Sequence, residues 1–121
     1  MGNKFYIGKN VYVFELSNDQ IKIGASFDIS RRIKEIENLM NCEVCNYDST
    51  VVLANWRKIE LMLHNYFKSF LVEGRYEYFN APFGDACEKM LEFSNEYGEL
   101  KERPEYEPWI DSFLYNFLFK F

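Results

Sequence analysis

The sequence lacks the features of exported, membrane-spanning and disordered chains. No stretch of its 121 residues approaches the roughly 20 consecutive apolar residues that a transmembrane helix needs. Asn3, Lys4 and Lys9 interrupt the start, which therefore does not resemble a signal peptide. We expect a cytoplasmic protein without a membrane partner. Because 48% of the residues are hydrophobic and 19% aromatic, the composition predicts a folded globular domain.

Cysteine is scarce, and its number is odd. Cys42, Cys45 and Cys87 lie in a chain without an export signal, so reduced thiols are expected. Cys42 and Cys45 form a C-x-x-C, but a zinc site would need a second suitably spaced pair of ligands. Cys87 and His64 do not supply that spacing, so we expect ordinary half-buried thiols.

Positive charge is also in short supply, which matters because phosphate contacts give most of the affinity for nucleic acid. The formal net charge is −5. Residues 1–72 hold nine Lys and Arg against eight Asp and Glu, whereas residues 73–121 hold five against eleven. The first part can therefore meet DNA on one face, while the second suits a basic protein partner.

Hydrophobic patterning predicts an α/β (α+β) domain over residues 1–98, with a small antiparallel three-stranded sheet flanked by helices. The strands are predicted at 11–16, 20–24 and 49–53, with a brief extended segment at 76–79. The first two form a hairpin around the turn residues 17–19. The helices are predicted from Asp28 or Ser30 to Asn41, from Asn55 to Gly74, and from about Ala81-Pro82 onward.

Residues 99–121 form an acidic connection followed by an apolar helix. Pro104 and Pro108 fall in or beside the charged stretch 99–107, which predicts a surface segment. Residues 109–121 then place apolar side chains at helical spacing along one wide stripe. Two interpretations stay open: the helix packs on its own domain, or it forms a homodimer with a second copy.

An ordered series of polar residues carries the functional signal. Tyr12 is followed by Lys22-Ile23-Gly24, then by Arg32, and later by Glu60 and His64 on one predicted helix. Each residue alone has an ordinary structural explanation, such as a half-buried strand tyrosine or a solvated helix arginine. Their order and spacing together favour a site.

This series resembles the GIY-YIG nuclease superfamily, in particular its compact phage and viral branch. Val11-Tyr12 falls at the end of the GIY motif, Lys22-Ile23-Gly24 falls at YIG, and the helix from Glu60 to Phe67 matches the second block. The resemblance covers about residues 10–80. It implies a phage- or virus-encoded protein in the host cytoplasm.

The resemblance also implies roles for individual residues. Tyr12 would act on the attacking water as general base or relay, and Arg32, or less so Arg31, would contact the phosphate. Glu60 would be the sole protein ligand of Mg²⁺ or Mn²⁺. The residues expected to line the substrate are Gly24, Ser26, Arg31 and Asn80.

Three positions depart from the family pattern. Asn10 replaces the first glycine, and Lys22 replaces the tyrosine of YIG, where a positive charge could lower the pKa of Tyr12. Asn80 is the counterpart of a late asparagine. His64 shares a helix face with Glu60, and it is either catalytic or packed near Phe67.

The sequence thus predicts a metal-dependent endonuclease or nickase that hydrolyses DNA, with Tyr12, Lys22, Arg32, Glu60 and His64 as candidate catalytic residues. It shows no separate DNA-reading module. One alternative is an inactive binding module that occupies a host protein through the acidic and apolar residues 99–121. Another is an oligomeric binder of a small ligand.

Overall fold

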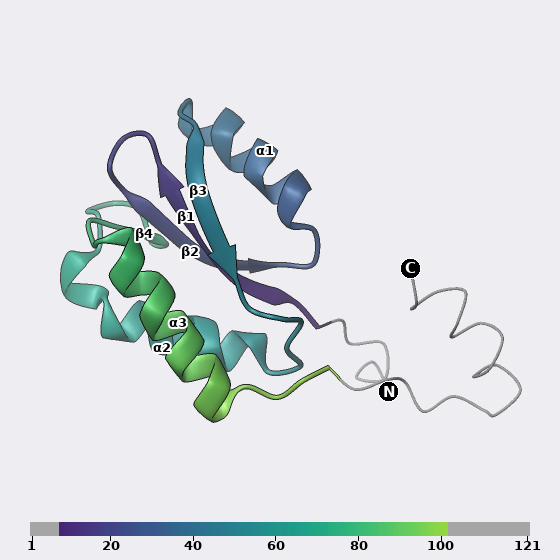
Figure 1. Cartoon of the computed structure of the whole chain (residues 1–121). Coiled ribbons are helices and arrows are strands. Elements are labelled where there is room, and N and C mark those ends of the chain that lie inside the picture. The colour runs from purple at the N-terminus through teal and green to yellow at the C-terminus, as the bar shows by residue number, and fades with distance from the viewer. Residues whose placement is uncertain (1–7, 102–121) are drawn as a thin grey trace, which may run out of the picture.

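The computed structural model describes residues 8–101, which fold into one sheet with helices on both of its faces (Figure 1). None of the helices in this part of the chain is long and apolar enough to cross a membrane. In chain order the elements are β1 (Asn10–Leu16), β2 (Ile21–Ser26), α1 (Ile29–Met40), β3 (Val44–Ser49), α2 (Trp56–Tyr66), the 3₁₀ helix η2 (Lys68–Phe70), β4 (Tyr78–Phe79) and α3 (Phe83–Tyr97).

The sheet is antiparallel and has the strand order β3-β1-β2-β4. The predicted hairpin is confirmed, with Tyr12 opposite Gly24 and Phe14 opposite Lys22. The fold class is confirmed as well, but the sheet has four strands where the sequence predicted three. The fourth is the brief segment that ends in Tyr78-Phe79, which pairs with Ile21-Lys22 at the edge of β2.

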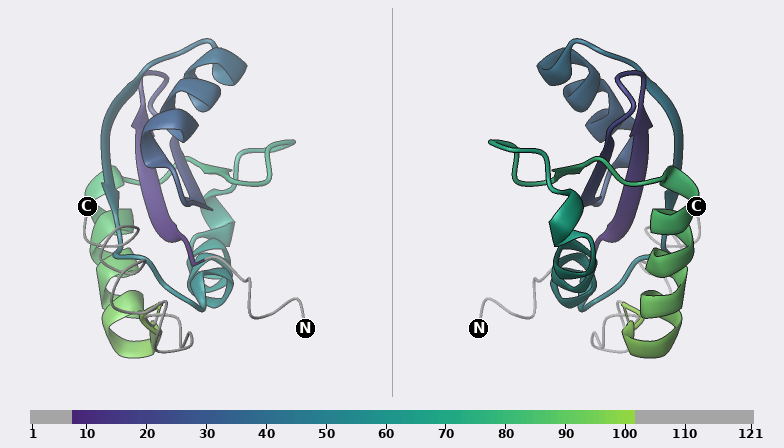
Figure 2. Two further views of the ribbon diagram at one scale, coloured as in Figure 1. Left: turned by 90° about the vertical axis from the view of Figure 1, so that its right-hand side faces the viewer. Right: turned by 90° about the vertical axis from the view of Figure 1, so that its left-hand side faces the viewer.

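Alternate residues of β1 and β2 point to opposite faces of the sheet. The odd-numbered residues form an apolar core with α2 and α3. The even-numbered residues of β1 pack against α1 and Tyr78 in a second, smaller core. Figure 2 shows α1 and α3 on opposite sides of the sheet. The odd-numbered strand residues in the larger core are Val11, Val13, Ile21 and Ile23.

Helix α1 has the boundaries that its end residues predict. The Asp28 side chain accepts a hydrogen bond from the Arg31 backbone N–H at 3.1 Å, which caps the first turn. Asn41 adopts the left-handed conformation that ends a helix, with φ of 53°.

Two predicted boundaries are wrong. The third strand lies at Val44–Ser49 and not at residues 49–53. It is an edge strand in which no residue is fully buried, so it lacks the apolar alternation that marks a half-buried strand. Val51 and Val52, which suggested a strand, lie beyond it and are exposed.

The second helix ends at Tyr66 and not at Gly74. The chain tightens into η2 and turns back, so that the Asn80 N–H donates to the Phe70 carbonyl. Gly74 instead occupies the loop before β4 with a φ of +80°, a conformation that suits glycine.

Both ends of the described domain meet at Leu53. Isolated bridges join Leu53 to Lys9 and to Leu100. Asn55, predicted as a cap of α2, stands at the N-cap position without capping the helix. Its side chain instead donates to the Tyr97 carbonyl and accepts from the Glu99 N–H, which fastens the end of α3 to the start of α2. The predicted helix 109–121 lies outside the described residues.

Candidate functional site

Tyr12 is the centre of the candidate site. It lies on β1 with its side chain fully buried against α1, and its ring stacks on Phe14 with centroids 3.9 Å apart. Its hydroxyl oxygen accepts a hydrogen bond from Arg32 Nε at 3.3 Å. The residue that opens the predicted series therefore touches the arginine that was predicted to bind phosphate.

Gly24 faces Tyr12 across the hairpin and leaves the space that the tyrosine hydroxyl occupies. A Cβ atom at this position would lie 2.5 Å from Tyr12 Oη and 3.1 Å from Lys22 Nζ. Any other residue would therefore collide with Tyr12. Because Gly24 has no side chain, the Tyr12 hydroxyl and the Lys22 ammonium both lie close to its Cα, beside β2.

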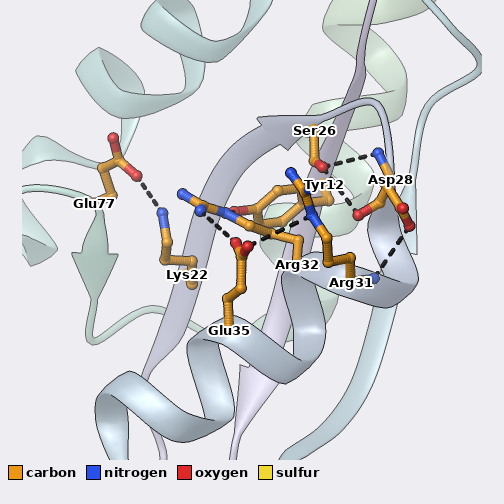
Figure 3. A network of polar contacts seen from close by, with 8 residues as sticks. All are labelled: Tyr12, Lys22, Ser26, Asp28, Arg31, Arg32, Glu35 and Glu77. Carbon is orange, nitrogen blue, oxygen red and sulfur yellow. Dashed lines mark hydrogen bonds and ion pairs between the residues drawn. The ribbon is translucent and has the colours of Figure 1, made fainter.

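Lys22 is buried, with 2% of its surface exposed, and forms an ion pair with Glu77 (Figure 3). Its Nζ lies 5.7 Å from the ring centroid of Tyr12 and 5.3 Å from that of Tyr78. Burial alone would raise the pKa of Glu77, but the hydrogen bond and charge of Lys22 outweigh burial and lower it. In the sequence, Glu77 stands out only as part of the brief extended segment 76–79, which does not indicate a partner. The partner is Lys22, a contact over 55 residues that local patterns cannot reveal.

The expected effect of Lys22 on Tyr12 is wrong. Burial raises the pKa of Tyr12 to about 12, against which the hydrogen bond and charge of Arg32 act weakly. Because Glu77 balances the charge of Lys22, the lysine does not produce a phenolate at neutral pH. Tyr12 is therefore a neutral hydroxyl in the resting protein.

The arginine pair lies in the first turn of α1, where Glu35 is its acidic partner. Arg32 Nη1 lies 3.0 Å from Glu35 Oε1, and Arg31 Nε lies 3.5 Å from Glu35 Oε2. Figure 3 shows Arg32 reaching from α1 towards Tyr12. The hydrogen bond to Tyr12 raises the pKa of Arg32 further, so its guanidinium stays charged. Arg31 is more exposed and has Phe27 beside it, at 5.7 Å from the ring centroid.

Glu60 presents a buried carboxylate from α2. Only 6% of its surface is exposed, and its Oε1 receives no hydrogen bond from the described residues. The nearest cation is the exposed Arg57, whose Nη1 lies 3.8 Å from Oε1. Burial raises the pKa of Glu60, while His64, Arg57 and Lys22 act in the other direction. A buried acceptor without a partner is a costly arrangement that a bound cation would relieve.

A single carboxylate fits a hard divalent ion that keeps its waters and takes a further oxygen from phosphate. Within residues 8–101, no group of three or more His, Cys, Asp or Glu could hold a metal ion.

His64 contacts the backbone of β2 and the ring of Phe79. Its Nε2 lies 2.9 Å from the Ile23 carbonyl oxygen, and its ring centroid lies 5.4 Å from that of Phe79. It therefore joins α2 to the edge of β2, one residue from Gly24. This contact positions the helix that carries Glu60.

Two of the residues expected to line the substrate have other surroundings. Ser26 exchanges hydrogen bonds with the Asp28 backbone and shapes the turn before α1. Asn80 directly follows Phe79, which pairs with Ile21 near the hairpin turn, so it is not beside Gly24. Gly24 and Arg31 do lie at the Tyr12 end of the hairpin.

The family model of the T5orf172 domain matches residues 9–96, which include every candidate site residue. No curated protein and no solved structure matches the chain. The T5orf172 domain is a phage-associated domain grouped with endonuclease-like domains. The broad prediction of a phage-type, nuclease-like domain is therefore confirmed, whereas membership of the GIY-YIG superfamily itself stays a prediction.

Proposed function

The chain belongs to the T5orf172 domain family, and on that premise we propose that it is a metal-dependent endonuclease or nickase of the GIY-YIG type, which hydrolyses DNA phosphodiester bonds. One observation carries the proposal. The Tyr12 hydroxyl lies in the space that Gly24 leaves beside β2 and accepts a hydrogen bond from Arg32 at 3.3 Å.

Arg32 and Tyr12 supply the groups that a phosphodiester needs. The guanidinium of Arg32 is charged and partly exposed, so it can bind a phosphate oxygen while Nε holds the tyrosine. Because Arg32 donates to the Tyr12 oxygen, the hydroxyl proton of Tyr12 is left to donate to a water or a phosphate that enters this buried position. Tyr12 would orient the attacking water and relay its proton, which contributes about 10²–10⁴-fold to a rate.

Glu60 would hold the divalent ion, Mg²⁺ or Mn²⁺, which supplies Lewis-acid stabilisation of the phosphate and the leaving oxygen when bound. His64 would fix α2 against the Ile23 carbonyl and so aim the Glu60 carboxylate. Lys22 would place a positive charge beside the Tyr12 ring, and Glu77 would balance that charge.

The test is nicking of supercoiled plasmid by the purified chain in Mg²⁺ or Mn²⁺. We expect relaxed or linear product that EDTA and Glu60→Gln both abolish. Glu88→Gln, which makes the same charge change on the exposed side of α3, should cut at the rate of the parent protein. Equal cutting by Glu60→Gln and the parent protein would exclude Glu60 as the metal ligand.

A protein-binding function on the same fold is the second candidate, because the described domain is acidic. Residues 8–101 hold eleven Lys and Arg against fifteen Asp and Glu, and the raised pKa of Tyr12 disfavours a phenolate base. Such a module would bind a basic host protein. Absence of cleavage in every metal and salt condition, together with capture of a basic DNA-binding protein that Glu60→Gln captures equally well, would favour it.

A further inference from the structure

A cleft of about 230 Å³ adjoins the Tyr12–Arg32 contact, and several of the residues that line it have no role above. It lies between α1 and the segment that leads into β4. Arg32 lines both the cleft and the proposed phosphate site. The residues that carry the argument are Lys22, Arg32, Glu35, Tyr76, Glu77 and Tyr78.

The rim of the cleft is apolar and exposed. Tyr76 is 86% exposed, and Leu39, across the cleft on α1, is 74% exposed. Exposed side chains of this kind contribute little to folding, but they offer flat apolar surface to a ligand. An exposed tyrosine ring beside an arginine is a typical stacking platform for a nucleobase.

The interior of the cleft offers polar groups. Glu35 and Glu77 present carboxylate oxygens. Glu77 pairs with Lys22 through Oε1, whereas Glu35 pairs with Arg32 through Oε1 and with Arg31 through Oε2. Tyr78 is buried, with 8% of its surface exposed. Its hydroxyl has no hydrogen-bond partner among the described residues. Buried polar atoms are normally satisfied, so an unpartnered hydroxyl in a cleft wall points to a ligand or water that completes it.

The two walls are fastened to one another. Arg75 Nη1 lies 2.8 Å from Met40 Sδ, which ties the loop before β4 to the end of α1. The base of the loop is closed by the Val72 N–H, which donates to the Tyr78 carbonyl at 2.8 Å. Figure 2 shows this loop projecting from the sheet on the side of α1. The cleft is therefore a formed feature of the fold.

We infer that this cleft binds one unpaired nucleobase of the substrate, stacked on Tyr76 with its amino edge towards Glu35 or Glu77. The volume suits a single base, because sites for drug-sized ligands measure roughly 300–1,000 Å³. Carboxylates accept hydrogen bonds from exocyclic amino groups, as they do from cytosine N4. The phosphate of the same nucleotide would then lie at Arg32. As a substrate subsite, this assignment rests on the proposed function.

A paired base cannot enter the cleft without leaving its stack, and this extrusion is cheapest where the base is already unpaired. The protein should therefore prefer DNA with a bulge, mismatch or single-stranded stretch next to the bond it cuts. This preference also compensates for the small number of basic residues, because stacking adds affinity that does not depend on phosphate contacts.

The test uses 2-aminopurine, a fluorescent base with an amino group, placed as a single bulged nucleotide in a short DNA duplex. Binding is measured in EDTA with the Glu60→Gln protein, so no hydrolysis is needed. We expect the fluorescence of the bulged base to change on binding, and the bulged duplex to bind at least about fivefold more tightly than the fully paired one, the lower end of stacking energies.

Tyr76→Ala should abolish both the fluorescence change and the preference, whereas Tyr76→Phe should keep them. Tyr97→Ala is the matched control, because this exposed tyrosine stands at the end of α3, away from the cleft. Equal binding of bulged and paired duplexes by the parent protein, or an unchanged preference in Tyr76→Ala, overturns the inference.

The outcomes separate this inference from the nuclease proposal. Plasmid nicking with no bulge preference would leave the nuclease standing and remove the base cleft. Bulge binding through Tyr76 without nicking in any metal would keep the cleft and remove the enzyme. If free 2-aminopurine nucleoside monophosphate binds as tightly as the bulged duplex, the cleft is a site for free nucleotides, and its role as a DNA subsite is overturned.

Discussion

The two faces of the sheet use neighbouring residues of the same strands for different purposes. On one face, Val13 and Ile23 belong to the larger apolar core, which they share with side chains of α2 and α3. On the other, Tyr12 and Lys22 combine burial with a hydrogen bond or an ion pair. The alternation of a strand thus separates stability from chemistry by a single residue. Changes at adjacent positions should therefore have opposite consequences.

The strongest test of this separation is Tyr12→Phe, which removes one oxygen and keeps the ring. We expect nicking to fall by about 10²–10⁴-fold, the range for a lost proton-transfer group. The free energy of unfolding should change by no more than about 1 kcal/mol, because the stack on Phe14 remains and one hydrogen bond is lost. Single-turnover nicking and urea unfolding measure the two quantities. A large loss of stability would show that the face with Tyr12 and Lys22 also stabilises the fold.

The opposite substitution is Ile23→Ala, next to Lys22 and Gly24 but on the apolar face. Truncating this fully buried side chain should destabilise the protein by about 2–5 kcal/mol. At a temperature well below its midpoint of unfolding, the variant should nick DNA within a fewfold of the parent rate. Thermal unfolding followed by circular dichroism gives the first quantity. A loss of nicking in fully folded protein would contradict the separation of the two faces.

The pH dependence of nicking tests how Tyr12 acts on the face of the sheet that it shares with Lys22. Because burial raises the pKa of Tyr12 to about 12, its phenolate fraction grows about tenfold per pH unit up to that pH. If Tyr12 reacts as the phenolate, the nicking rate should rise by about that factor per unit between pH 7 and 9. Tyr12→Phe should lose this slope. A flat profile in the parent protein would instead assign Tyr12 a role as a neutral hydroxyl.

Much of the site could be predicted from the sequence because its main residues stand on two locally determined elements. The alternation of β1 and β2 and the turn between them set Tyr12 opposite Gly24. The cap at Asp28 sets the start of α1 and thereby the position of Arg32. Each of these features depends on residues close in sequence, so periodicity and capping are enough to place them.

The rest of the site depends on contacts that local patterns do not contain. Glu77 pairs with Lys22 only because the chain turns back after η2 and adds β4 to the sheet. The prediction that α2 extends to Gly74 hid this turn, and with it the loop that carries Tyr76. The edge strand β3 was missed for the related reason that an exposed strand has no apolar alternation to detect.

The smallest expected effect is on the melting temperature of the Glu60→Gln variant. Burial raises the pKa of Glu60 above its usual 4.5, so the folded state disfavours the ionised form. Protonation stabilises the fold below pH 4.5, and this contribution is lost as the pH rises through the raised pKa. Without metal, Glu60→Gln should therefore melt a few degrees higher than the parent protein at pH 8. The difference should shrink as the pH falls towards 4.5, and Glu88→Gln should show no such trend.

Lys9 and Leu100 both bridge to Leu53, so the two ends of the described domain lie side by side. A unit whose two ends leave side by side can be inserted into a surface loop of another protein, or reconnected end to end and opened elsewhere, without separating its strands. The same fold could thus be carried at the beginning, middle or end of longer chains.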